Sequence, residues 1–472
     1  MISLLLAILS PFAFANSIDW SGTYRFESVY VSNADLVDDS KNYFLHHLVL
    51  KPHIVAADGM HIYGRFDILN NDDSRYSDVN NQLGSYLGDS PASSEETNDL
   101  NSRALQSAQK TSYLNVSQLY LRWVQEHGNL LVGRAPKHFG LGIHYNAGDG
   151  LFDHWLTTHD VVAYQMIWGN IYFQPYFAKV EEGNVNQNSS DTQEVGIVIN
   201  YENPETDLKM GAYYEERKNS AGLRSGTGLH PFGGADSLSY GGYEHQNWSL
   251  FLAKDYGKFA FDLEVGFNSG DTGVLNKNNE QIDLDAFAVI AELDYQYNEK
   301  WNILLNMGMV TGDDPDTDGT YEGYWVHRNY NIATLLFNHP IGQLSVNNVN
   351  YATSTTNAYS AADIDSDRVS NVMYFTPGFE YYFNDRWTLK SQFVYAQLME
   401  DPRGTGDAPS VSNGSKDLGY ELDVGLSYQP IERVKVKLDL GYLDAGDAFK
   451  GGSQNYNIDS IYGFETGIAV RF

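Results

Sequence analysis

Charged side chains of opposite sign occur in two separate regions of this 472-residue chain, at positions that alternate with apolar ones. The basic set lies in the first third of the chain: Arg25, Arg65, Arg122, Arg134 and, just beyond them, Lys137. The acidic set comes later: Asp262, Glu264, Glu292 and Asp294. If the two sets face each other across water, they create a transverse field that orients dipolar solutes. The alternative is local neutralisation, of Arg25 by Glu27 and of Arg65 by Asp67.

A run of alternating carboxylates is the second candidate site. Asp314, Asp316 and Asp318 precede Gly319, which is similar to the start of a calcium-binding loop. The twelfth position of that loop is Trp325 rather than Glu, so Glu322 would have to complete the shell. The sequence therefore allows a Ca²⁺ site in this segment, with a solvated acidic loop as the alternative. We expect no other cofactor.

Motifs of enzymes and of nucleic-acid binding are absent from the sequence. The chain has no phosphate loop, dinucleotide fingerprint, HExxH or nucleophile elbow, and it has no cysteine for thiolate chemistry. Its formal net charge of -31 would repel nucleic acid. We expect a protein that is not an enzyme and has no nucleic-acid partner.

Strict alternation of apolar and polar residues runs through the chain from Ile18 onward, which is the pattern of strands with one apolar and one polar face. The clearest segments span residues 259–268, 421–428 and 434–442. The mean hydropathy is -0.39, and beyond the N-terminus no window approaches the ~18 apolar residues of a membrane helix. Membrane-spanning β-strands need only about ten residues of alternating polarity, so the hydropathy does not exclude a transmembrane β-barrel.

The connections between these segments alternate between short and long. Short ones fall at 57–59, 126–128, 169–170, 202–206, 255–258, 297–300, 339–342, 384–386 and 431–433, and longer polar stretches lie between them. This spacing predicts an all-β, antiparallel up-and-down transmembrane β-barrel of about 20 strands. The count falls to 18 if the weakest strands, 129–141 and 343–351, do not form. An even count places both termini at the short-turn end.

Two further segments have distinct roles in this interpretation. Residues 1–15 end in Ala13-Phe14-Ala15, a small-x-small pattern that predicts a cleaved signal peptide, with a buried strand as the alternative. The barrel then comprises residues 16–472. Its longest loop, 70–112, could constrict the pore with a short helix at 99–110, or could lie on the surface.

The last strand carries a resemblance to a known family. Phe464, Ile468, Val470 and Phe472 share one face, and the segments YGRFDI (63–68) and VGRAPKHFGLGI (132–143) look like strand ends of porins. This pattern resembles Gram-negative outer-membrane β-barrel porins, which end on an aromatic residue that the barrel-assembly machinery recognises. The resemblance implies an outer-membrane location and a role of Phe472 as an assembly signal.

These observations together predict a porin, a water-filled channel for passive diffusion of ions and small hydrophilic solutes. The alternative is a surface adhesin or receptor barrel that binds a partner or lipopolysaccharide through its acidic loops; a barrel enzyme is a third class. The expected partners are outer-membrane lipid and lipopolysaccharide, the assembly machinery, small solutes and further copies of this chain in a homo-oligomer.

Overall fold

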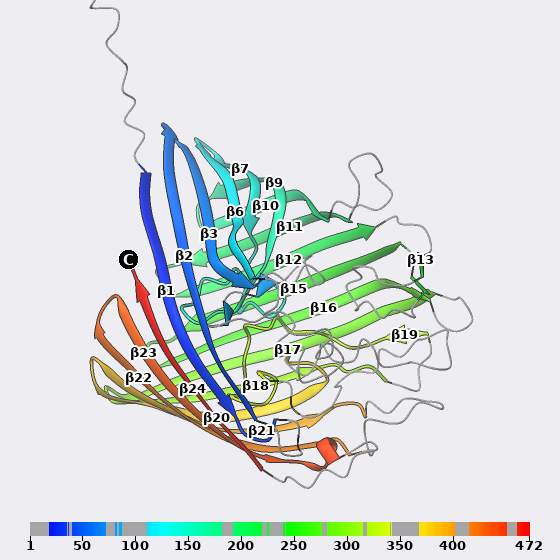
Figure 1. Cartoon of the computed structure of the whole chain (residues 1–472). Helices are drawn as coiled ribbons and strands as arrows, with labels where there is room; N and C mark the ends of the chain where they lie inside the picture. Colours follow the sequence, from blue (N-terminus) through cyan, green and yellow to red (C-terminus); the bar gives the residue numbers. More distant parts are fainter. Residues whose placement is uncertain are drawn as a thin grey trace, which may run out of the picture.

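The protein is an antiparallel β-barrel in a computed structural model (Figure 1). The structure describes residues 18–34, 36, 40–71, 81–82, 85–86, 111–181, 192–219, 224–225, 239–240, 242–275, 281–314, 319–339, 341, 368–401, 415–450 and 460–472. The barrel strands are β1 (Ile18–Val31), β2 (Lys41–Ala57), β3 (Met60–Asn71), β6 (Thr111–Gln125), β7 (Gly128–Pro136), β9 (Thr158–Trp168), β10 (Ile171–Glu181), β11 (Thr192–Asn203), β12 (Leu208–Asn219), β15 (Tyr243–Asp255), β16 (Phe259–Leu275), β17 (Gln281–Asn298), β18 (Trp301–Val310), β20 (Val372–Asn384), β21 (Trp387–Leu398), β22 (Asp417–Ile431), β23 (Val434–Ala445) and β24 (Ser460–Arg471).

Short elements accompany the barrel in the described part of the chain. They are the strands β4 (Asn81–Gln82), β5 (Ser85–Tyr86), β8 (Trp155–Leu156), β13 (Arg224–Ser225), β14 (Ser239–Tyr240) and β19 (Thr320–Tyr321), and one turn of 3-10 helix, η7 (Asp447–Lys450). Among the described residues, no helix is long and apolar enough to cross a membrane.

The barrel closes because the first strand pairs with the last as well as with the second. Strand β1 pairs with β2 along its whole length and with β24 from Thr23 to Val31. Beyond that ladder, Gly22 and Phe472 exchange both backbone hydrogen bonds, at 2.9 and 3.0 Å. Closure removes every free strand edge, which a barrel in lipid requires.

The predicted fold class is confirmed, with 18 strands, the smaller of the two predicted counts. Strand β18 pairs directly with β20 over ten positions, from Trp301↔Tyr381 to Val310↔Val372, so the barrel has no place for two more strands between them. The short turn predicted at 339–342 is therefore wrong, and the strand predicted at 343–351 lies outside the described residues. The doubtful strand at 129–141 does form, as β7.

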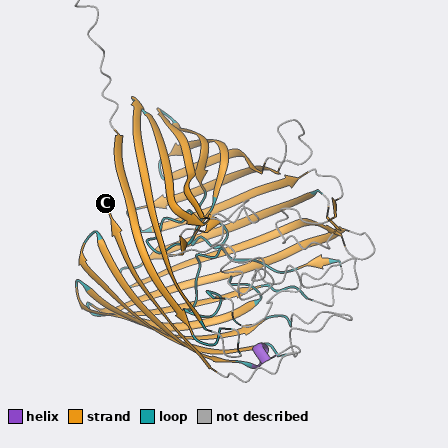
Figure 2. Ribbon diagram, viewed as in Figure 1, coloured by secondary structure: helices purple, strands orange, loops and turns teal. Residues whose placement is uncertain are grey.

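The other eight short turns predicted from the sequence join neighbouring strands, and all lie at one end of the barrel. The strand ends that the long connections join lie at the other end of the barrel (Figure 2). The first described residue, Ile18, and the terminal Phe472 lie at the short-turn end. Residues 1–17, which include the predicted signal peptide, lie outside the described part.

The outward-facing side chains of the strands are apolar and exposed. They include Leu119, Val162, Phe177, Val195, Trp248, Leu250, Phe267, Phe393, Leu422 and Ile468. Trp168, Tyr297 and Trp301 are exposed beside the short turns, where amphipathic rings suit a membrane interface. An apolar surface that encircles a closed barrel is what lipid contact requires, because water would leave it unstable.

The inner face is covered by two connections that fold into the barrel (Figure 2). Residues 137–157 follow β7, and residues 319–341 belong to the connection between β18 and β20. Ile143 from the first and Val326 and Leu335 from the second are fully buried, in one cluster with inward-facing Ile282 and Ile290 of β17. Described loops, rather than side chains of the strands alone, thus fill part of the lumen.

Candidate functional site

A buried carboxylate on the barrel wall holds the first inward connection. Glu264 of β16 accepts hydrogen bonds from the Leu141 backbone N–H at 2.6 Å and from the Ser249 hydroxyl at 2.7 Å. Gly140 has φ +55°, and a Cβ there would lie 2.5 Å from Glu264 Oε2, so only glycine allows this approach. Glu264, predicted as a free lumen charge, is fully buried and anchors the loop instead.

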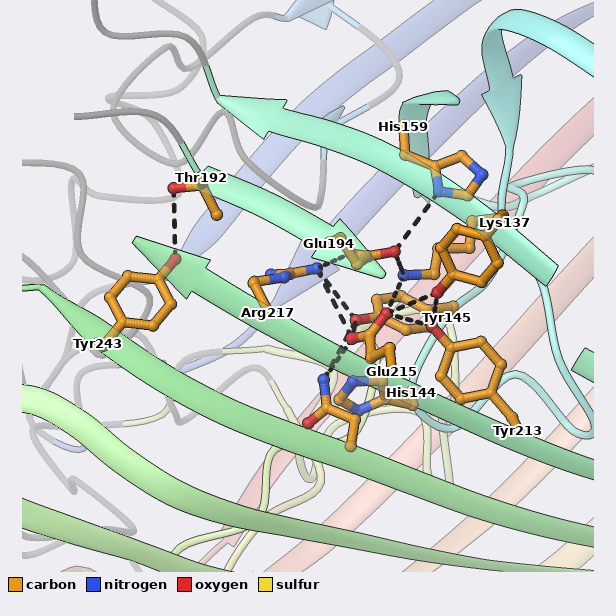
Figure 3. A network of polar contacts seen from close by, with 12 residues as sticks. Lys137, His144, Tyr145, His159, Thr192, Glu194, Tyr213, Glu215, Arg217 and Tyr243 are labelled. Atoms are coloured by element: carbon orange, nitrogen blue, oxygen red, sulfur yellow. Dashed lines mark hydrogen bonds and ion pairs between the residues drawn. The ribbon is translucent and has the colours of Figure 1, made fainter. Parts of the chain in front are cut away.

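The same connection is fixed to the wall by a charge network (Figure 3). Lys137 Nζ lies 2.6 Å from Glu194 of β11 and 2.5 Å from Glu215 of β12. Arg217 contacts Glu194 at 2.9 Å, and the Tyr145 hydroxyl donates to Glu215. Two cations thus match two carboxylates, as buried charges require. Lys137 is only 6% exposed, so its charge is not accessible from the lumen, contrary to the prediction that it lines the pore.

One titratable group of the first connection is notable for its environment. His144 lies against the Tyr145 ring, at 4.2 Å between ring centroids, and its Nδ1 is 3.3 Å from the Tyr324 hydroxyl of the second connection. Burial lowers the pKa of His144 to about 4. The neutral imidazole is therefore the form that fits between the two connections.

A second pair of wall carboxylates holds the second connection. Glu421 of β22 accepts from the backbone N–H of Leu335 at 2.7 Å and of Leu336 at 2.9 Å. Asp423, two residues on, accepts from Thr334 N–H at 3.1 Å. The backbone donors of this turn are thereby satisfied without water. Backbone N–H groups of both inward connections thus donate to lumen-facing acids, which fixes the two connections to the barrel wall.

Two of the predicted basic residues are neutralised by the neighbours that the sequence offered as the alternative. Arg25 Nε lies 3.0 Å from Glu27, and Arg65 Nε lies 3.1 Å from Asp67. Both arginines face the lumen and are buried under the first connection, where Arg65 also donates to the Gly148 carbonyl at 3.0 Å. The two arginines therefore hold the first connection in place and do not present unpaired positive charge to the lumen.

Arg134 lies on the other face of the barrel from the one predicted. Arg134 is two residues from Val132 in β7 and therefore points to the same face, and Val132 is exposed on the outer surface. The Arg134 guanidinium makes two hydrogen bonds to Asp160, at 2.8 and 2.9 Å. Both partners are 51% exposed. The prediction that Arg134 lines the pore is corrected for this reason. Arg122 of β6 does face the lumen, near the short-turn end, and is exposed.

The remaining predicted acids form one wall near the short-turn end. Asp262 of β16 is directly opposite Glu292 of β17 in register, and Asp294 lies two residues further along β17. The Tyr330 hydroxyl of the second connection donates to Glu292 at 2.9 Å, and Asn302 donates to Asp294 at 2.9 Å. Strand β17 is twelfth and β3 third around the 18-stranded ring, so this wall is diametrically opposed to β3, as predicted.

The side chains beside the first connection are accessible to solvent. Lys51, on the lumen face of β2, pairs with Asp149 of the inward connection at 2.5 Å. Their side chains are 38% and 60% exposed. An ion pair inside the barrel that is exposed to this degree borders a solvent-accessible space, because two charges in a dry core would be covered.

The remaining predictions for the site have mixed outcomes. Phe472 lies on the outer face and is 45% exposed, whereas Arg471 points to the lumen, as predicted for the last strand.

In the predicted calcium loop, Glu322 accepts a hydrogen bond from the Asp314 backbone N–H at 3.4 Å, while Asp316 and Asp318 lie outside the described residues. Within the described ranges no three potential metal ligands cluster. Most of the loop 70–112, including the expected helix at 99–110, also lies outside them.

Sequence reasoning missed the anchoring residues Glu194, Glu215, Arg217 and Glu421. Their signal was available: each is a charge at an inward position of a strand, in the half of the strand nearer the long connections. A buried charge at such a position requires a partner. Here the partner of Glu194 is Arg217 on the adjacent strand together with Lys137 of the inward connection.

Comparison with known proteins supports the fold. No protein-family model and no curated protein sequence matches the chain. OccAB4 of Acinetobacter baumannii aligns with a TM-score of 0.51 at 12% identity, over 97% of this chain and 98% of that one. OccK1 (OpdK) of Pseudomonas aeruginosa gives a TM-score of 0.48 at 11% identity, over 96% of this chain and 98% of that one. The chain has the porin-like barrel fold of these outer-membrane proteins.

Proposed function

We propose that the chain forms a narrow, water-filled channel through which ions and small hydrophilic solutes diffuse passively across the outer membrane. The observation that carries this proposal is the exposed Lys51–Asp149 pair inside a barrel whose outer face is apolar. A barrel of this strand number is too wide for its own side chains to fill, so water occupies what the inward connections leave open.

The two inward connections distinguish this channel from a wide general pore. They are fixed to the wall by Glu264 and Glu421, whose oxygens accept backbone hydrogen bonds. A solute must therefore pass charged and polar groups at close range, which favours selectivity over simple sieving. Near the short-turn end, the described lining includes the exposed Arg122 on one side. On the other side it includes the partly exposed acids of β16 and β17, with Lys209 and Lys390 near them.

Planar-bilayer recording tests the proposal. Purified barrel should give stable current steps, and removal of residues 319–341 should enlarge them because it widens the passage. Persistent silence, with insertion shown by heat-modifiable migration on gels, would contradict the channel and favour the surface-receptor alternative. We expect no catalytic activity. We retain as predictions binding of lipopolysaccharide, recognition of Phe472 by the assembly machinery, a homo-oligomer, and Ca²⁺ at Asp314, Asp316, Asp318 and Glu322.

A further inference from the structure

Four ring side chains form a stacked row on adjoining strands β2, β3 and β6. The His53 ring is parallel to Tyr63 within 4°, at 4.6 Å between centroids, and lies 5.2 Å from His61. Tyr63 in turn stacks on Tyr120 of β6 at 5.2 Å. His53 Nε2 and His61 Nδ1 are 3.0 Å apart, within hydrogen-bond distance, which fixes the orientation of the two imidazoles.

The row faces the lumen below the first inward connection. Tyr63 points to the same face of β3 as Arg65, which contacts that connection. His53 points to the same face of β2 as Lys51, which pairs with Asp149 of the connection. All four rings are partly exposed, and they lie in the half of their strands nearer the short turns. Ring surface is therefore presented to the solvated passage rather than buried in a core.

A guanidinium stands at the end of this row. Arg122 is the register partner of His61, and it lies two residues from Tyr120 on the same face of β6. Its side chain is exposed, unlike the buried Arg25 and Arg65. An accessible guanidinium binds a carboxylate through two parallel hydrogen bonds.

We propose that this surface, His53, His61, Tyr63, Tyr120 and Arg122, is a binding subsite for aromatic carboxylates. The planar ring of the solute stacks on the row while its carboxylate binds Arg122. Favourable aromatic pairs add binding free energy beyond the area that they bury, so a short row of rings provides measurable affinity. The inference rests on the proposed channel, whose solute class it specifies.

Other cations of the described lumen lie beside other partners. Arg328 lies over the Trp155 ring and Lys437 pairs with Glu465. Lys209 and Lys390 lie near the acids of β16 and β17. The cations Lys137 and Arg217 are buried against carboxylates. The opposite wall presents Asp262, Glu292 and Asp294, which repel an anion. Rings and an exposed cation adjoin at the row, so the subsite lies on this side of the passage.

Calorimetric titration of the folded barrel in detergent with benzoate tests the subsite without requiring conduction. Acetate lacks the ring and benzyl alcohol lacks the charge, so both should bind at least roughly ten-fold more weakly. Tyr63→Leu or Tyr120→Leu should weaken benzoate binding by a similar factor. Arg122→Gln should remove the preference for benzoate over benzyl alcohol. Trp123→Leu, which removes an exposed outer-face ring of the same strand, is the matched control and should leave binding unchanged.

The outcomes separate the subsite from the channel. Benzoate binding that depends on Tyr63, Tyr120 and Arg122 supports the subsite, even if bilayers remain silent and the channel proposal fails. A conducting barrel that binds benzoate no better than acetate overturns the subsite and leaves the channel intact. Equal binding by wild type and all three variants, each folded by heat-modifiable migration, also overturns it.

Discussion

Gly22 and Phe472 close the barrel in direct contact: they exchange two backbone hydrogen bonds, and a Cβ on Gly22 would lie 2.6 Å from Cζ of the Phe472 ring. The same Cβ would lie 2.3 Å from the Val49 carbonyl oxygen of the neighbouring strand. The terminal ring therefore covers the first strand on the outer face, and this contact is available only while position 22 lacks a side chain.

Replacement of Gly22 by Val should destabilise the closed barrel by roughly 1–3 kcal/mol, because the ring and the β2 backbone must both shift. The measurement is the temperature at which the folded band disappears on gels. Gly319→Ala is the matched control, since a Cβ there meets nothing within 4 Å. Equal melting of the two variants would show that the terminal ring is free to move away.

Replacement of Phe472 by Asp should impair assembly while leaving synthesis and export intact. A charge would sit on the lipid-facing side of the last strand, where a ring that is 45% exposed now lies. Arg471→Ser, at the adjacent lumen-facing position, should be far milder. Folded barrel in outer-membrane fractions is the readout, and comparable assembly of both variants would argue against the face assigned to Phe472.

Ion selectivity should depend on Arg122 and not on Arg134. Loss of the lumen-facing Arg122 charge, in Arg122→Gln, should shift the reversal potential in a salt gradient toward cations because the opposite wall is acidic. Arg134→Gln should leave it unchanged, since Arg134 pairs with Asp160 on the outer face. A larger shift from Arg134 than from Arg122 would reverse the assignment of faces on β7.

Removal of the Glu264 carboxylate should release the first inward connection. In Glu264→Ala, the Leu141 N–H and the Ser249 hydroxyl lose their acceptor, at a cost of about 1–3 kcal/mol for each buried donor left without one. Mean conductance and its fluctuation should both rise. Glu264→Gln retains an acceptor oxygen and should have a smaller effect. If the alanine variant conducts like the wild type, the connection is held by the Lys137 network alone.

Docking of the two inward connections should weaken in acid through His144. Burial lowers the pKa of this imidazole to about 4 from an ordinary value of 6.5, so the released loop binds a proton more readily than the docked one. Docking is therefore fully stable above about pH 6.5 and loses stability as the pH falls toward 4. Channel noise should increase between pH 7 and pH 5 in the wild type.

The matched comparison for this pH effect is His144→Gln, which cannot titrate. Several charged groups face the imidazole and are shared by both proteins: Glu215, Lys137, Arg217 and Glu194. A noise increase of equal size in His144→Gln would assign the acid response to one of these groups or to another histidine, and not to His144.

The sequence by itself determined the class of fold and the faces of most strands. Period-two alternation specifies which side chains meet lipid, because consecutive side chains of a strand point to opposite faces. Eight short turns were predictable from local chemistry, and the outward position of Phe472 followed from the parity of the last strand. Alternation was weak around residues 129–141, and there the face of Arg134 was assigned wrongly.

Only the tertiary structure decided which connections enter the lumen and which charges remain accessible. The contacts that settle this join residues far apart in the chain, such as Leu141 with Glu264 and Leu335 with Glu421. They arise because closure of the barrel brings distant strands around one interior, where each buried carboxylate must find donors. A loop of glycines and apolar residues shows no period of its own, so its destination depends on that interior and not on its local sequence.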